Sequence, residues 1–211
     1  RFLLEKPACT SISQIETLYN YNYDFGIGYV LLYTRGVQKI ANMNQKWNFA
    51  HFFRSNQKVI RKDCYVVYDL LCHDLAIAMY ILGTNYKIIY INYSTDVITC
   101  LIQFEQCVCY FYCSRDDDIK MSSCSFSNSE NSVFYNDINK EININNQLEY
   151  FAGDNPLKTQ LSYLTNDKPF LADSKFGVKI HEIMKNIELY RKGPWGISQS
   201  VVIGDNKINP I

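Results

Sequence analysis

The hydrophobic period of the chain changes at Gly83, and this change constrains the fold more than any other feature. Before it, apolar residues recur at spacings of three and four: Val67, Leu71, Leu75, Ala78 and Leu82. The spacing predicts a helix from about Tyr65 to Leu82 that Gly83 ends. After it, residues 86–91, 97–104 and 107–113 are rich in Ile, Val, Tyr and Phe. These runs predict strands, paired antiparallel.

Weaker patterns complete the order of elements. Ala8, Ile12, Ile15 and Tyr19 share one helical face after Pro7, which suits a first helical turn. Residues 29–33 form a short apolar run of undecided type. The polar, Ser-rich stretch 115–131 predicts an exposed loop. Short strands follow at 132–136 and 142–144, and a last amphipathic helix runs from about Phe176 to Ile187 before Gly193-Pro194.

This order predicts an α+β fold in which N-terminal helices pack on a small antiparallel sheet, with a helical C-terminal tail. A chain of 211 residues suits one domain, and no stretch is long enough to be a linker between two. We therefore expect a single domain over 1–211, with a core of about 7–151 and a helical extension of about 152–211.

Charge and hydropathy exclude two classes of protein. Lys plus Arg and Asp plus Glu each number 21, so no net charge draws the chain to nucleic acid. Charged and polar residues interrupt the most apolar stretch at Asp69, His73 and Asp74, so no membrane span is expected. The adjacent His73 and Asp74 are predicted to be surface groups. No signal peptide follows Arg1, which favours the cytoplasm, while the missing initiator Met leaves secretion open.

Eight cysteines allow a disulfide framework, but their spacing favours free, mostly buried thiols. Cys107 and Cys109 share one face of a strand, where neighbours bridge only with distortion. No second Cys pair or nearby His pair completes a zinc site, and Gly26-Ile-Gly28 completes no nucleotide-binding motif. No metal and no cofactor are expected.

Cys9 is the first candidate for chemistry. It lies two residues into the helix expected to open at Pro7, where exposed amides and the helix dipole favour a thiolate. The alternative is a small buried apolar residue at a helix start.

Two segments resemble papain-like cysteine proteins. The stretch from Cys9 to Asp24 is similar to the nucleophile helix of bacteriocin double-glycine peptidases. It resembles more closely the acyltransferases typified by butirosin biosynthesis protein H. Residues 132–140, followed by Ile142 and Ile144, resemble the strand that carries the Asp of such a triad. The resemblance covers about residues 7–151. It implies a papain-like fold, with Cys9 as the acyl-accepting nucleophile and Asp137 as the orienting carboxylate.

The sequence departs from this pattern at two places. Residues 120–126 contain no His, and residues 2–5 contain no Gln for an oxyanion hole. His51, in an aromatic loop with Trp47, Phe49, Phe52 and Phe53, is the candidate to fold over the site and move a proton. Ordinary packing of this loop is the alternative.

Three other sites carry weaker signals. Cys72, or Cys64, near His73 and Asp74, is similar to the nucleophile of transglutaminase-like proteins, but no strand His follows. Arg35, Ser94-Thr95 and Glu105 are similar to the pocket of ADP-ribosyltransferases. Asp116, Asp117 and Asp118 lack the spacing of an EF-hand and indicate a solvated acidic loop.

The resemblance implies cysteine-dependent acyl transfer, or cleavage of a thioester or amide, on an acyl carrier protein or a peptide. The alternative is a non-catalytic binding module or a secreted interaction module. Its seventeen tyrosines would supply contact area for a partner.

Overall fold

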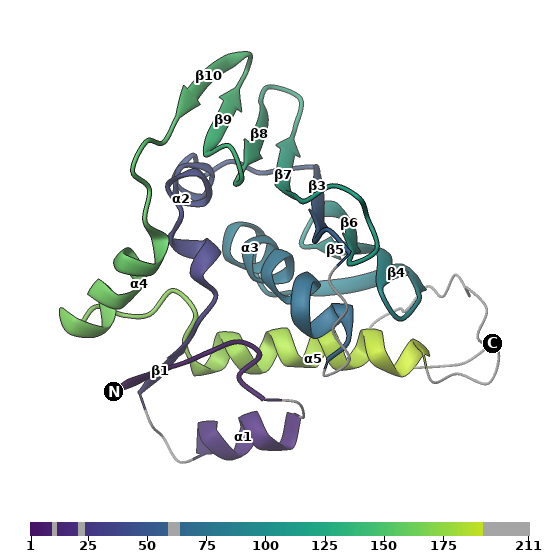
Figure 1. Cartoon of the computed structure of the whole chain (residues 1–211), viewed down its shortest axis with the longest axis vertical. Coiled ribbons are helices and arrows are strands. Elements are labelled where there is room, and N and C mark those ends of the chain that lie inside the picture. The colour runs from purple at the N-terminus through teal and green to yellow at the C-terminus, as the bar shows by residue number, and fades with distance from the viewer. Residues whose placement is uncertain (10–11, 21–23, 59–63, 192–211) are drawn as a thin grey trace.

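The computed structural model describes residues 1–9, 12–20, 24–58 and 64–191. An eight-stranded mixed sheet dominates it, in the order β10-β9-β8-β7-β3-β6-β5-β4 (Figure 1). The strands are β3 (Phe49–Ser55), β4 (Tyr86–Tyr93), β5 (Val97–Phe104), β6 (Cys107–Ser114), β7 (Met121–Ser127), β8 (Ser132–Asn136), β9 (Glu141–Ile144) and β10 (Gln147–Tyr150). Neighbouring strands are antiparallel except β3 and β6, which run parallel at the centre.

A second, two-stranded parallel sheet joins β1 (Phe2–Leu4) to β2 (Phe25–Ile27). The helices are α1 (Ile12–Asn20), α2 (Arg35–Asn42), α3 (Cys72–Leu82), α4 (Pro156–Thr165) and α5 (Ser174–Arg191). A 3-10 turn, η1 (Val30–Tyr33), precedes α2, and a π-helical turn, η2 (Val67–Leu71), leads directly into α3.

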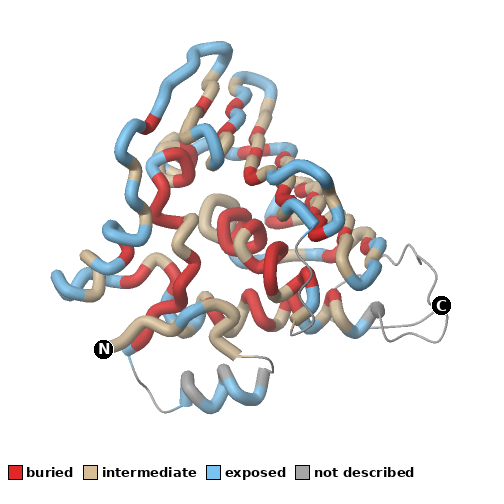
Figure 2. Tube along the Cα trace, viewed as in Figure 1, coloured by how far each residue is buried: buried red, intermediate tan, exposed pale blue. Residues whose placement is uncertain are grey.

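The strands bury one face of the sheet. On β5 the buried residues Ile98, Cys100, Ile102 and Phe104 alternate with half-buried ones, as the two-residue period of a strand requires. Helix α3 packs against β5 and β6 on this face, and seven of its eleven residues are buried. Figure 2 shows this buried core running through α3 into the sheet.

The predicted helix of residues 65–82 is confirmed, with a π-helical first part. It ends at Gly83, whose φ of 107° suits glycine and whose N–H donates to Met79 O over 3.0 Å. The predicted strands β4, β5 and β6 are also confirmed, with antiparallel pairing.

The predicted papain-like fold is wrong. The sheet is large and mixed rather than small and antiparallel. The first helix begins at Ile12 instead of at Pro7. The C-terminal helices are part of the core, since Ile180, Ile183 and Ile187 of α5 have no exposed surface. Residues 192–211, which include the predicted stop at Gly193-Pro194, lie outside the described residues.

Two strands were predicted to be loops. In β7, within the Ser-rich stretch, Ser122, Cys124 and Phe126 are buried in alternation with half-buried neighbours. The aromatic segment around His51 is β3, in the middle of the sheet. Small serines hide the alternation in β7, and aromatic residues on both faces hide it in β3.

The cysteine prediction is confirmed for six residues, which are buried free thiols: Cys72, Cys100, Cys107, Cys109, Cys113 and Cys124. Within the described ranges, no helix has the length and apolar character that a membrane crossing needs.

Candidate functional site

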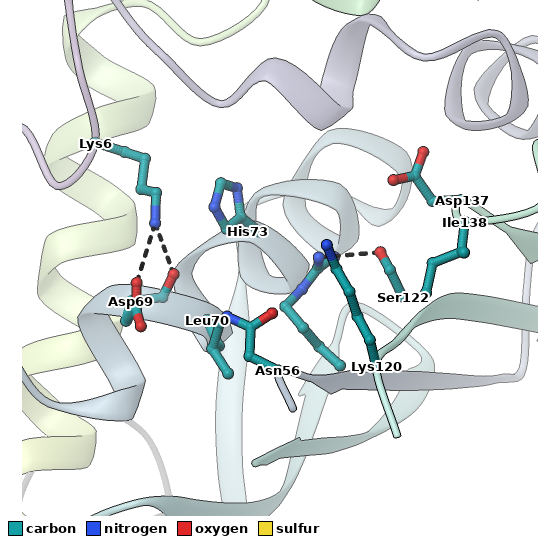
Figure 3. Close-up of a pocket in the computed structure, with 10 residues that line it drawn as sticks. Lys6, Asn56, Asp69, Leu70, His73, Lys120, Ser122, Asp137 and Ile138 are labelled. Carbon is teal, nitrogen blue, oxygen red and sulfur yellow. Dashed lines mark hydrogen bonds and ion pairs between the residues drawn. The ribbon is translucent and has the colours of Figure 1, made fainter. Parts of the chain in front are cut away.

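A cavity of about 470 Å³ opens between the η2–α3 junction and the ends of β3 and β7 (Figure 3). All but two of its lining residues are polar or charged. The lining consists of Lys6, Arg54, Asn56, Asp69, Leu70, His73, Lys120, Ser122, Asp137 and Ile138.

Asp69 and His73 form one wall because of their spacing. They lie four residues apart across the junction of η2 and α3, so their side chains share one face. The π-helical turn holds Asp69, and such turns occur often at functional sites.

Lys6 reaches the same wall from the segment that follows β1. Its Nζ donates to the backbone oxygen of Asp69 over 2.7 Å and lies 3.6 Å from the Asp69 carboxylate. The buried guanidinium of Arg115 lies 3.9 Å from that carboxylate on another side. Asp69 therefore holds the Lys6 ammonium at the cavity.

His73 is partly buried, and its Nδ1 has no hydrogen-bond partner among the described residues. Burial, with the positive charges of Arg54 and Lys6, holds the pKa of His73 well below its ordinary value. The ring is therefore neutral at neutral pH and carries a lone pair that can accept a proton.

The opposite wall comes from β3 and β7. Arg54 and Ser122 are paired in the sheet register, and Arg54 Nη1 donates to Ser122 Oγ over 3.0 Å. Arg54 also holds the buried Asp74 carboxylate in a two-pronged contact of 2.6 and 3.0 Å. Asp74 is thus a buried partner of Arg54 and not the surface group that the sequence predicted.

Asp137 lies next to this wall, after β8. Its carboxylate accepts from Tyr135 Oη over 2.8 Å and from Lys140 Nζ over 2.6 Å. Both contacts leave an acceptor oxygen available to a ligand in the cavity.

The three residues predicted to be catalytic are not gathered in one place. Of Cys9, His51 and Asp137, only Asp137 lines the cavity. His51 lies on β3 two positions from Phe49 and Phe53, and its ring packs on both of them.

Cys9 lacks the predicted activation. It lies outside the described helix α1, which begins at Ile12, and burial raises the pKa of its thiol to about 11. Of the three histidines in the chain, His181 is the one beside it, with Nε2 lying 3.7 Å from Cys9 Sγ.

Two of the weaker candidates, Cys72 and Asp117, have ordinary structural roles. Cys72 is buried inside the helix and its Sγ donates to Tyr68 O over 3.1 Å, while burial raises the pKa of the thiol to about 12. Asp117 accepts from Tyr112 and Ser114. No group of His, Cys, Asp and Glu within the described ranges is arranged to hold a metal ion.

The sequence assigned no role to Lys6 or Asp69, and it predicted His73 to be a surface group. The detectable signal was the four-residue spacing of Asp69 and His73 on a helix that is otherwise apolar, since two polar side chains on one face of such a helix need a common polar environment.

Several solved structures that share this fold are described as dehydrogenases, ketoreductases or oxidoreductases. UDP-N-acetylglucosamine 3-dehydrogenase GnnA from Acidithiobacillus ferrooxidans superposes with a TM-score of 0.77 at 15% identity, over 89% of this chain and 69% of that one. A dehydrogenase (MviM) from Clostridium difficile superposes with a TM-score of 0.74 at 14% identity, over 89% of this chain and 70% of that one. KijD10, a 3-ketoreductase from Actinomadura kijaniata in complex with NADP and TDP-benzene, superposes with a TM-score of 0.71 at 11% identity. The superposition covers 89% of this chain and 70% of that one. No protein-family model and no curated protein sequence matches the chain.

These neighbours are Gfo/Idh/MocA-family oxidoreductases. At such low identity the likeness establishes the fold alone. It overturns the papain-like resemblance and with it the predicted cysteine-dependent acyl transfer or peptide cleavage.

Proposed function

We propose that this chain binds a small polyhydroxylated substrate and moves the proton when a hydroxyl group and a carbonyl group of that substrate are interconverted. One observation carries the proposal: the Lys6 ammonium and the neutral His73 imidazole line the same polar cavity.

The two groups suit the oxygen atom of this reaction. Oxidation of a secondary alcohol removes a proton from oxygen and a hydride from carbon. A neutral imidazole has a lone pair on one of its two nitrogens, and His73 accepts the proton there, while the Lys6 N–H donors stabilise the negative charge that develops on the oxygen. In the reverse direction the protonated His73 returns the proton to the oxygen.

The remainder of the cavity suits a substrate with several hydroxyl groups. Asn56, Ser122 and Asp137 offer both donors and acceptors, and only Leu70 and Ile138 are apolar. The names of two neighbours, a UDP-N-acetylglucosamine dehydrogenase and a 3-ketoreductase, fit such a substrate class.

The hydride acceptor would be a nicotinamide cofactor, because NAD+ and NADP are bound in two neighbours. The described residues do not fit this group. A dinucleotide needs a glycine-rich turn with open space before a helix. In Gly26-Ile-Gly28, a Cβ on Gly26 would meet the Phe170 ring at 2.4 Å, and one on Gly28 would meet Leu4 O at 3.2 Å. Protein atoms fill both spaces, so we assign no step of hydride transfer to these residues.

The test is turnover of the full-length protein with NAD+ or NADP+ and a panel of myo-inositol, glucose and UDP-N-acetylglucosamine. Lys6→Met and His73→Ala are each expected to lower kcat at least about 100-fold, the usual contribution of a positioned acid or base. Lys87→Met and His51→Ala are the matched controls, because both residues lie outside the cavity.

Turnover that survives in Lys6→Met and His73→Ala contradicts the proposal. An equal loss in the control variants contradicts it as well, since the effect then comes from the fold and not from the cavity.

A further inference from the structure

The half-buried Asn56 and the exposed Lys120 lie opposite each other among the residues that line the cavity. Ser55 and Met121 are the last register pair of β3 and β7, so the next residues on each strand face one another. They also share a face with Arg54 and Ser122, two positions back on each strand. All four residues line the cavity, and Figure 3 shows the amine of Lys120 directed into it.

Lys120 differs from the other charged groups of the cavity. Lys6 is held by Asp69, Arg54 by Asp74, and Asp137 by Lys140. Neither the Lys120 ammonium nor the Asn56 side-chain amide has a hydrogen bond or an ion pair within the part of the chain that the structure describes. Among the described residues, the Lys120 ammonium and the Asn56 amide thus line the cavity with no hydrogen-bonded or ion-paired partner.

The acidic residues before Lys120 do not neutralise it. Asp117 accepts from Tyr112 and Ser114, and Asp118 pairs with Lys58, so these two carboxylates are directed to other partners. The charge of Lys120 is therefore available to a ligand.

We propose that Lys120 and Asn56 bind an oxyanion of the substrate, a carboxylate or a phosphate. This inference rests on the proposed function and names its substrate class: an acidic derivative of a polyhydroxylated compound. An ammonium and an amide N–H supply donors to one oxyanion. The pair lies on the wall opposite Lys6 and His73, so an anion bound there leaves the remainder of the substrate to extend toward the reacting groups (Figure 3).

The experiment measures equilibrium binding by isothermal titration calorimetry with three probes of one ring size: D-glucuronate, D-glucose 6-phosphate and D-glucose. At least one acid is expected to bind at least tenfold more tightly than glucose, and its affinity alone is expected to fall with added salt. The stronger acid identifies whether the oxyanion is a carboxylate or a phosphate.

Three variants assign the preference to this place. Lys120→Gln is expected to bring the acid and glucose to equal affinity, and Lys120→Arg to restore most of the preference. Lys87→Gln, the removal of an exposed charge on β4, is expected to leave it unchanged.

Equal affinity of the wild-type protein for glucose and both acids overturns the inference, as does an acid preference that survives in Lys120→Gln. Absence of binding by all three probes also overturns it. The proposed function fails on a different readout, because it is contradicted by turnover that survives loss of Lys6 or His73.

Discussion

Buried polar residues carry the chemistry of this cavity, and each is fixed by a specific neighbour. Asp69 lies between the charges of Lys6 and Arg115, and Asp74 is held by both prongs of Arg54. A buried carboxylate without such a partner would be costly. His73 is the exception, since its Nδ1 has no described partner and its surroundings disfavour the charged ring.

This exception predicts how stability depends on pH. The unfolded chain takes up a proton at His73 near an ordinary pKa of about 6.5, while the folded protein does so only at lower pH. Between these two pKa values the unfolded state binds more protons. Stability should therefore fall as the pH is lowered below about 6.5, by up to about 1.4 kcal/mol per pH unit.

Urea unfolding across this range measures the slope. The variant His73→Gln should have a shallower slope than the wild-type protein, and His51→Gln controls for loss of a histidine outside the cavity. An unchanged slope in His73→Gln would show that His73 does not cause the acid sensitivity.

At the scale of elements, α5 fixes the segment that carries Lys6. His181 on α5 is almost fully buried, and its Nε2 lies 2.9 Å from the carbonyl oxygen of Cys9, three residues beyond Lys6. Its Nδ1 lies 3.0 Å from Gly177 O, in the same helix. The ring thus connects α5 to the strand-to-helix segment of the site.

Removing this contact should loosen the Lys6 segment. His181→Ala is expected to cost about 1–3 kcal/mol of stability, the usual cost of leaving a buried polar group unpaired. Amide hydrogen exchange of residues 2–9 should become faster. Lys185→Ala, an exposed change on the same helix, should do neither. Unchanged exchange in His181→Ala would refute the role of this contact.

The elements that the sequence predicts well are those with one clear hydrophobic period, such as the helix ending at Gly83 and the strands β4 to β6. The period fails in β7, where Ser122 and Ser123 hide which face is buried. The site is not predictable from local pattern alone, because Lys6, His73 and Lys120 come from three distant segments. The sequence predicts a helix around Cys9, whereas the described helix α1 begins at Ile12.

At the scale of the whole molecule, the sheet differs in protection from centre to edge. The central strands β3 and β6 have neighbours on both sides, whereas all four residues of the edge strand β10 are exposed. Local opening is easiest where little surface is buried. Amides of β10 should therefore exchange much earlier than those of β3 and β6 in hydrogen-exchange mass spectrometry, and comparable rates would contradict this order.

The parallel pairing of β3 with β6 also sets an order of assembly. During synthesis β3 emerges before either of its neighbours, β6 and β7, exists. Strand β3 stays unpaired until helix α3 and the antiparallel strands β4 and β5 have been made, because a parallel partner requires a long crossover. Arg54 and Asn56 lie at the C-terminal end of β3. Lys120 and Ser122 lie at the start of β7 and are therefore synthesised later. Because Lys120, Ser122 and Asp137 also line the cavity, the site is complete only after β7 and the residues that follow β8 have been made.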